Sequence, residues 1–95
     1  MAAYLIAGID VTNPEQYTQY IAQTPGVIEK FGGRFIARGG ETVTLEGQEE
    51  TRRIVLVEFP SLEQAKAFYR SAEYQEVKKL REGAAEVHLV AVEGV

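Results

Sequence analysis

Three segments of the chain are apolar on both faces of a β-strand, and this feature limits the folds that the chain can adopt. Residues 4–11 place apolar side chains at odd and at even positions, and the same pattern recurs in residues 53–59 and 86–92. Strands with two apolar faces are covered on both sides. The sequence therefore predicts a sheet that needs cover on both of its faces.

The segments between these strands carry helix signals. Asn13 is a typical N-cap residue, with Pro14 at the first helical position, and a glycine pair ends the segment. Pro25 lies inside the apolar stripe of this first helix, and because proline lacks a backbone donor we expect two helical pieces rather than one straight rod. Ser61 opens a second capped helix, and Ser71 marks a fresh helix start.

The remaining segments complete a βαββαβ order. Residues 34–38 form a second short strand, and residues 41–51 form a polar connection with a candidate short strand at residues 42–45. This order within 95 residues is the ferredoxin-like split βαβ pattern. Right-handed crossovers then place four antiparallel strands in the order 4-1-3-2, with both helices on one face. We therefore predict an α+β fold with a single domain, residues 1–95.

The other face of this sheet needs a partner. With 45% hydrophobic residues, the short chain has more apolar sheet than two helices on one face can cover. An exposed apolar face of on the order of several hundred Å² is rarely left to water. The simplest cover is a second copy of the chain, so we predict a twofold homodimer that packs sheet to sheet.

The charge balance argues against nucleic acid and anionic membranes as partners. Ten Lys and Arg stand against fourteen Asp and Glu, and binding to either partner depends on basic patches. RNA-recognition domains share the βαββαβ order, and residues 52–59 partly match their third strand. However, Ile54 and Leu56 stand where the base-stacking aromatic residues would be. We therefore expect no nucleic-acid partner and no membrane partner.

Residue types also limit the cofactors. The chain has no cysteine and a single histidine, His88, whereas zinc needs three or four suitable ligands. We therefore predict no metal site and no cofactor.

No apolar run approaches the ~20 residues of a membrane span, and the N-terminal segment lacks the basic region of a signal peptide. We expect a cytoplasmic location.

Four short motifs carry a family resemblance. They are Tyr4–Asp10 (YLIAGID), Gly32–Gly40 (GGRFIARGG), Val57–Ser61 (VEFPS) and Ser71–Tyr74 (SAEY). With these motifs the chain resembles, over essentially its whole length, the bacterial "domain of unknown function 1330" family. The resemblance implies a dimeric α+β barrel, in a superfamily that also contains cofactor-independent monooxygenases, haem-degrading enzymes and lactone isomerases. It implies no particular reaction, because a shared fold does not transmit chemistry.

The predicted strand order gathers four polar residues at one end of the sheet: Asp10, Arg38, Arg53 and His88. Such a group suits an anionic or carbonyl-bearing small molecule, with Arg38 holding a carboxylate or enolate. His88 and Asp10 are the catalytic candidates, His88 as an acid or base. The alternative is structural: Asp10 pairs with Arg53 or Arg38, and His88 is an ordinary strand residue.

Aromatic residues on the inward helical stripes form a second candidate group. Tyr17, Tyr20 and Tyr69 are predicted to bind the ligand, in a pocket that they line with Phe68 and Tyr74. The alternative is that all five are core residues, although a buried tyrosine hydroxyl needs a polar partner.

At the other end of the sheet, Arg34 and Glu58 are predicted to form a cross-strand ion pair. Glu58 as a general base in an apolar pocket is the competing interpretation, and it would require a raised pKa.

Two classes of function stay open at this point. The first is a small enzyme, a cofactor-independent oxygenase or isomerase that acts on a carbonyl, aromatic or anionic compound. The second is a non-catalytic module for ligand binding or dimerisation. The sequence shows neither a nucleophile and base pair nor a metal set, and it therefore does not decide between them.

Overall fold

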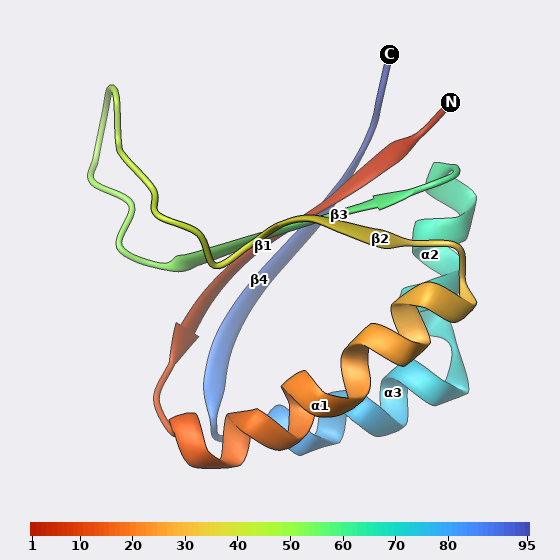
Figure 1. The fold of residues 1–95 in the computed structure, drawn as a ribbon, viewed down its shortest axis with the longest axis horizontal. Coiled ribbons are helices and arrows are strands. Elements are labelled where there is room, and N and C mark those ends of the chain that lie inside the picture. The colour runs from red at the N-terminus through yellow and green to blue at the C-terminus, as the bar shows by residue number, and fades with distance from the viewer.

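The computed structural model describes residues 1–95 as a curved four-stranded sheet with its helices on one side (Figure 1). The strands are β1 (Ala3–Val11), β2 (Arg34–Arg38), β3 (Arg53–Phe59) and β4 (Ala85–Glu93). They are antiparallel in the order β2-β3-β1-β4, which is the predicted order 4-1-3-2. The ferredoxin-like α+β prediction is confirmed.

The helices are α1 (Pro14–Lys30), α2 (Leu62–Arg70) and α3 (Ala72–Lys78), and a 3-10 turn, η1 (Lys79–Arg81), follows α3. No helix is both long enough and apolar enough to cross a membrane.

All three predicted N-caps are confirmed. The side chains of Asn13, Ser61 and Ser71 each accept a hydrogen bond from the backbone N–H three residues later, at 3.0 to 3.1 Å. Each bond satisfies a donor that the first helical turn leaves free.

The expectation that Pro25 divides the first helix is wrong, because α1 is continuous through this residue. A proline in a helix interior costs about 3 kcal/mol, so packing on both sides of Pro25 must outweigh this cost. Tyr17 and Thr24 are buried before the proline and Ile28 after it. The Thr24 hydroxyl also donates a hydrogen bond to the Tyr20 carbonyl at 2.6 Å, inside the same turn.

The connection between β2 and β3 contains no strand. Residues 42–45 lie in an irregular loop that extends away from the helices (Figure 1). The candidate short strand at these positions is therefore wrong. Val43 and Leu45 are almost fully exposed there, with no neighbouring strand to supply hydrogen bonds.

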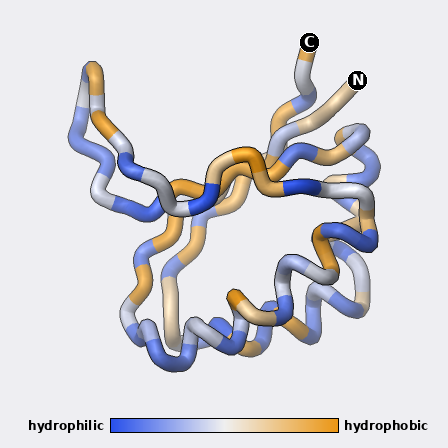
Figure 2. The backbone as a smooth tube through the Cα atoms, viewed as in Figure 1, coloured by the Kyte–Doolittle hydropathy of each residue, from blue (hydrophilic) through white to orange (hydrophobic).

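The register of the strands defines two faces of the sheet. On the helix face, Leu5, Val57 and Phe59 are buried together with Phe68 of α2 and Tyr74 of α3. The remaining face, called the open face below, carries apolar side chains with no helix over them: Ile6, Ile54, Leu56, Val90 and Val92. Figure 2 shows the corresponding hydrophobic stretches along the strands. Val90 and Val92 are 48% and 49% exposed.

The predicted pair of Arg34 and Glu58 is confirmed. The two residues are directly opposite in β2 and β3, and the Arg34 Nε lies 2.8 Å from the Glu58 Oε1. The carboxylate of Glu58 is therefore engaged in an ion pair on the open face.

Candidate functional site

A narrow cavity of about 60 Å³ lies between α1 and the helix face of the sheet. Its walls are mostly apolar, and its lining contains no histidine and no carboxylate. Two cations, Arg38 and Arg53, lie at its mouth, where both side chains remain accessible to solvent. The polar uncharged groups are the hydroxyls of Tyr17, Tyr20, Thr24 and Tyr74.

Strand geometry brings the two arginines to the same mouth. Arg53 pairs with Ile9 in the register of β1 and β3, and Ile9 faces the helices. Arg38 pairs with Val55, which is also buried on the helix face. Arg38 reaches this face only because β2 shifts its register between Phe35 and Ala37.

This irregularity changes which side chains share a face. Without it, Arg38 would lie on the same face as Arg34, four residues earlier, which pairs with Glu58 on the open face. With it, the Arg38 guanidinium carbon lies 4.4 Å from the ring centre of Phe35, a cation–π contact at the cavity mouth.

The Arg53 guanidinium lies close to the backbone of Gly39. A Cβ atom at Gly39 would lie 2.7 Å from the Arg53 guanidinium carbon, and Gly39 has a φ of +69°. Glycine is the residue that adopts this conformation at no steric cost and leaves room for the guanidinium. The glycine turn after β2 thus leaves room for the Arg53 guanidinium beside the cavity mouth.

Three tyrosines form the inner wall of the cavity. The rings of Tyr17 and Tyr20 stack with their centres 5.3 Å apart, and the hydroxyls of Tyr20 and Tyr74 lie 2.7 Å apart. Burial raises the pKa of Tyr17 and places the pKa of Tyr74 well above its ordinary value of 10.0. Both phenols are therefore protonated at neutral pH, and each hydroxyl carries a proton that is available for a hydrogen bond.

The four polar residues that were predicted to share one end of the sheet lie on two different faces of it. All four lie near that end, but Asp10 and His88 belong to the open face. His88 pairs with Gly8, and Asp10 pairs with Glu86. Neither residue lines the cavity of Arg38 and Arg53, and Asp10 forms no ion pair with either arginine.

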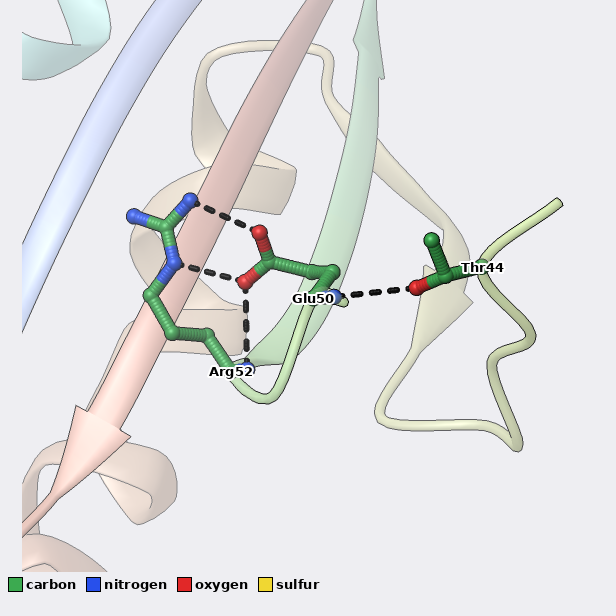
Figure 3. Close-up of polar contacts among 3 residues, drawn as sticks. All are labelled: Thr44, Glu50 and Arg52. Atoms are coloured by element: carbon green, nitrogen blue, oxygen red, sulfur yellow. Dashed lines mark hydrogen bonds and ion pairs between the residues drawn. The ribbon is translucent and has the colours of Figure 1, made fainter. Parts of the chain in front are cut away.

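A further arginine on the open face was missed by the sequence reasoning. The Arg52 guanidinium lies against the backbone of Gly8, where a Cβ would be 2.8 Å from its central carbon. Glu50 accepts hydrogen bonds from the Arg52 Nε at 2.7 Å and from the Nη2 at 3.1 Å (Figure 3). Its own backbone N–H donates to the Thr44 hydroxyl at 2.9 Å. These bonds to Arg52 lower the pKa of Glu50.

Tyr69, the third tyrosine of the predicted ligand site, does not line the cavity. It lies in a separate groove of about 600 Å³ between α2, η1 and the edge strand β4, and His88 borders this groove from β4. In the sequence, the closely spaced lysines and arginines of residues 66–81 were the signal for this groove.

No cluster of three or more His, Asp or Glu side chains offers the ligands for a metal ion.

Several solved structures share this fold. One is a protein of unknown function, RPA0582 from Rhodopseudomonas palustris. It shares 22% identity over 99% of this chain and 82% of that chain, with a TM-score of 0.75. A dimeric ferredoxin-like protein of unknown function from Jannaschia sp. shares 9% identity over 99% and 100% of the two chains, with a TM-score of 0.65.

A further solved structure with this fold is SnoaB, a cofactor-independent oxygenase from Streptomyces nogalater. It shares 8% identity over 99% of this chain and 93% of that chain, with a TM-score of 0.70. At these identities the likeness establishes the fold and leaves the chemistry to the site.

No functionally curated protein matches this sequence. A family model does match, over residues 2–95, and it covers all four strands, all three helices and both arginines of the cavity. The chain therefore belongs to the family described as domain of unknown function DUF1330.

Proposed function

We propose that this chain is a homodimeric protein whose cavity binds a small, largely apolar or aromatic compound with an anionic oxygen, such as an enolate, a phenolate or a carboxylate. The observation that carries this proposal is the charge state of the cavity mouth. Arg38 and Arg53 are the only ionised residues of the lining, and neither has a carboxylate partner.

The parts of the cavity match the two parts of such a ligand. The apolar body would pack against the aromatic wall of Tyr17 and Tyr20, which offers ring faces and few polar atoms. The anionic oxygen would lie at the mouth, where the two guanidinium groups donate charge-assisted hydrogen bonds. A volume of about 60 Å³ holds only a few water molecules, so the cavity must widen as a ring-sized ligand enters.

Cofactor-independent oxygenation is the reaction that this cavity supports best. In such a reaction the arginines stabilise the enolate of the substrate, which then reduces O₂. A CH₂ group becomes a carbonyl, one oxygen atom of O₂ enters the product, and the other leaves as water with the two hydrogens. The lining offers no proton acceptor, so the reaction is limited to substrates acidic enough to ionise in water and bind as the enolate, whose charge the arginines stabilise. Similarity to the fold of SnoaB supports the same class.

Isomerisation fits the cavity less well. A proton transfer between two carbon atoms needs a group that accepts and returns the proton near neutral pH. The lining has no histidine or carboxylate, and burial keeps its phenols Tyr17 and Tyr74 protonated. The same lack of a base supports the second candidate function, a binding protein without turnover.

The homodimer rests on the open face and on fold relatives described as dimeric. Ile6, Leu56 and Val90 lie side by side in three adjacent strands, with no helix over them. A second copy placed there buries this surface and leaves the cavity mouth free, because the mouth is on the helix side.

The binding proposal is tested by titration calorimetry with 2-naphthoate, an aromatic anion. Arg38→Gln and Arg53→Gln should each weaken binding by about tenfold or more, the effect of losing a charge-assisted hydrogen bond. Arg34→Gln, on the open face of the same strand as Arg38, is the matched control and should leave the affinity unchanged. Equal affinities in all three variants would contradict the proposed site.

Oxygenation is tested separately with 1,3-indandione, an aromatic diketone whose CH₂ group ionises to an enolate near neutral pH without a protein base. An oxygen electrode should record O₂ uptake that depends on the protein, and ¹⁸O₂ should label the product. Binding of 2-naphthoate without any O₂ uptake would instead favour the binding protein over the oxygenase.

A further inference from the structure

The groove between α2, η1 and β4 gathers cations in an otherwise acidic chain. Four basic side chains line it, and no carboxylate does: Lys66, Arg70, Lys78 and Arg81. The formal net charge of the whole chain is -4. Like charges at this density repel one another, so the groove is electrostatically complementary to an anion.

The ion pairs of the chain show which lysines and arginines have an acidic partner and which do not. Carboxylates pair with Lys30, Arg34, Arg52, Lys66 and Lys79. The lysines and arginines that remain without a carboxylate are Arg38 and Arg53 at the cavity mouth and Arg70, Lys78 and Arg81 in the groove. Every cation that lacks an acidic partner therefore lines one of these two concave sites.

Two of the groove cations are held in place by aromatic neighbours instead. The Lys78 ammonium donates a hydrogen bond to the Tyr69 hydroxyl at 2.8 Å and lies 5.1 Å from the centre of that ring. The Arg81 guanidinium carbon lies 5.5 Å from the ring centre of Tyr20. Such contacts fix the position of a cation without neutralising its charge.

Arg81 also carries an unused donor. Its Nε is buried and has no hydrogen-bond partner within the protein. A buried donor without a partner is unfavourable, and an acceptor on a ligand at the inner end of the groove would satisfy it.

We propose that this groove is a second ligand site, which binds a small anion of at least two negative charges, such as a phosphate ester or a polycarboxylate. Arg70 and Lys78 bind it at the rim, the Tyr69 hydroxyl contributes a polar contact beside Lys78, and Arg81 binds it at the inner end. The site goes beyond the proposed function, because none of these residues lines the cavity of Arg38 and Arg53.

The dimensions and position of the groove fit a small ligand. Its volume of about 600 Å³ lies in the range of about 300–1,000 Å³ that is common for small-molecule sites. A few cations on an acidic protein are too few for nucleic acid, which needs extended basic surface. The groove lies on the helix side, so a dimer through the open face leaves it accessible.

The test is titration calorimetry of the full chain with pyrophosphate and with citrate, each in low-salt buffer. We expect saturable binding of one anion per chain. Arg70→Gln and Lys78→Gln should each weaken it by about tenfold or more. Backbone amide shifts of Ala65, Tyr69 and Ala91, which border the groove, should follow the same binding curve in NMR spectra.

Lys79→Gln is the matched control. Lys79 is the next residue after Lys78 and pairs with Glu76 outside the groove, so this variant should bind within twofold of the unchanged chain. A loss as large as that of Lys78→Gln would reveal adventitious attraction to net charge and would overturn the proposal. Absence of saturable binding to both probes in the unchanged, folded chain would also overturn it.

Two further outcomes separate this site from its alternatives. If Arg38→Gln abolished binding of pyrophosphate, the anion would occupy the cavity mouth, and the groove proposal would be wrong while the cavity proposal stood. If a hexaglutamate peptide bound ten times more tightly than either small anion, the groove would be a site for an acidic protein segment instead.

Discussion

The hydroxyl oxygens of Tyr20 and Tyr74 lie 2.7 Å apart and connect α1 to α3 at the inner wall of the cavity. Tyr74 is almost fully buried, with 1% of its surface exposed. Each hydroxyl supplies the polar partner that the other needs in an apolar surrounding. The guanidinium carbon of Arg81, a residue of the groove, lies 5.5 Å from the ring centre of Tyr20, so this tyrosine pair adjoins both proposed sites.

Tyr74→Phe should lower the free energy of unfolding and change its dependence on pH. The loss of one hydrogen bond costs about 1 kcal/mol, because the Tyr20 hydroxyl remains without its partner. Below pH 10.0, the ordinary pKa of tyrosine, the Tyr74 phenol is protonated in both states and its stabilisation is fully present. As the pH rises further, the unfolded chain releases this proton while the folded chain retains it, so stability falls.

Urea unfolding between pH 8 and pH 11 measures this effect. The decrease in stability above about pH 10 should be shallower in Tyr74→Phe than in the unchanged chain, because one titrating group of the unfolded state is gone. Identical slopes would mean that the buried phenol does not resist ionisation.

Gly33→Ala should destabilise the fold, whereas Gly26→Ala should stabilise it. A Cβ at Gly33 would lie 2.7 Å from the ring of Phe59 and 2.8 Å from a methyl carbon of Ile28, and both side chains are buried. Overpacking of this kind costs about 1–3 kcal/mol. Gly26 in α1 has no atom within 4 Å of such a Cβ, and alanine gains about 0.5–1 kcal/mol there. Chemical denaturation should give a lower free energy of unfolding for Gly33→Ala and a higher one for Gly26→Ala. A change of the same sign in both variants would show that the contacts around the new Cβ do not determine the effect.

Pro25→Ala should raise the free energy of unfolding. It restores a backbone donor inside α1 and removes a ring that a helix interior tolerates at a cost of about 3 kcal/mol. We expect a gain of about 1–3 kcal/mol by urea denaturation. Pro14→Ala is the control, because proline at the first helical position loses no helical bond and should give no gain. A loss of stability in Pro25→Ala would show that α1 depends on the proline ring.

The alternation of side chains along a strand explains which parts of the site were predictable. Asp10 and His88 lie at even positions of their strands with Gly8 and Val90, and Arg53 lies at an odd position with Val55. Their separation onto two faces follows from this parity. Arg38 could not be placed in this way, because the irregularity in β2 moves it to the face opposite Arg34. A β-bulge of this kind leaves no distinct mark in residues 34–38.

The fold itself was predictable because local and long-range signals agree. Caps at Asn13, Ser61 and Ser71 determine where the helices begin. The strands with apolar residues on both faces require a sheet that is covered on both sides. The continuity of α1 through Pro25 was not predictable, since it depends on tertiary burial of Ile28 rather than on local propensity. The groove was also missed, because the lack of acidic partners for Lys78 and Arg81 appears only in three dimensions.

Val90→Glu should convert the proposed homodimer into a monomer. Val90 of the edge strand β4 pairs with Ile6 of β1 on the open face and is half-exposed in the single chain. A second copy would bury the new carboxylate without a partner, at a cost of several kcal/mol. Multi-angle light scattering at micromolar concentration should give twice the chain mass for the unchanged protein and the mass of one chain for the variant.

Gln19→Glu is the matched control for this experiment, since it adds the same charge to the exposed surface of α1, on the helix side. It should remain dimeric. A dimer in Val90→Glu, or a monomer in the unchanged protein, would contradict association through the open face.

Arg52→Gln should raise the pKa of the Glu50 carboxyl towards its ordinary value, because the two side-chain bonds are lost and only the backbone bond remains. The Arg52 side chain lowers this pKa through two hydrogen bonds, and the Arg52 backbone N–H adds a third (Figure 3). A lowered pKa means that the contribution of this pair to stability is present above pH 4.5 and is lost as the pH falls through the pKa of the folded state. Carbon-detected NMR titration of the carboxyl measures the shift directly. An unchanged carboxyl pKa in Arg52→Gln would show that the two side chains are not paired in solution.

Glu50→Gln should release the Arg52 guanidinium, because Glu50 holds Arg52 against Gly8. The mobility of residues 44–52 should then increase, as measured by ¹⁵N relaxation.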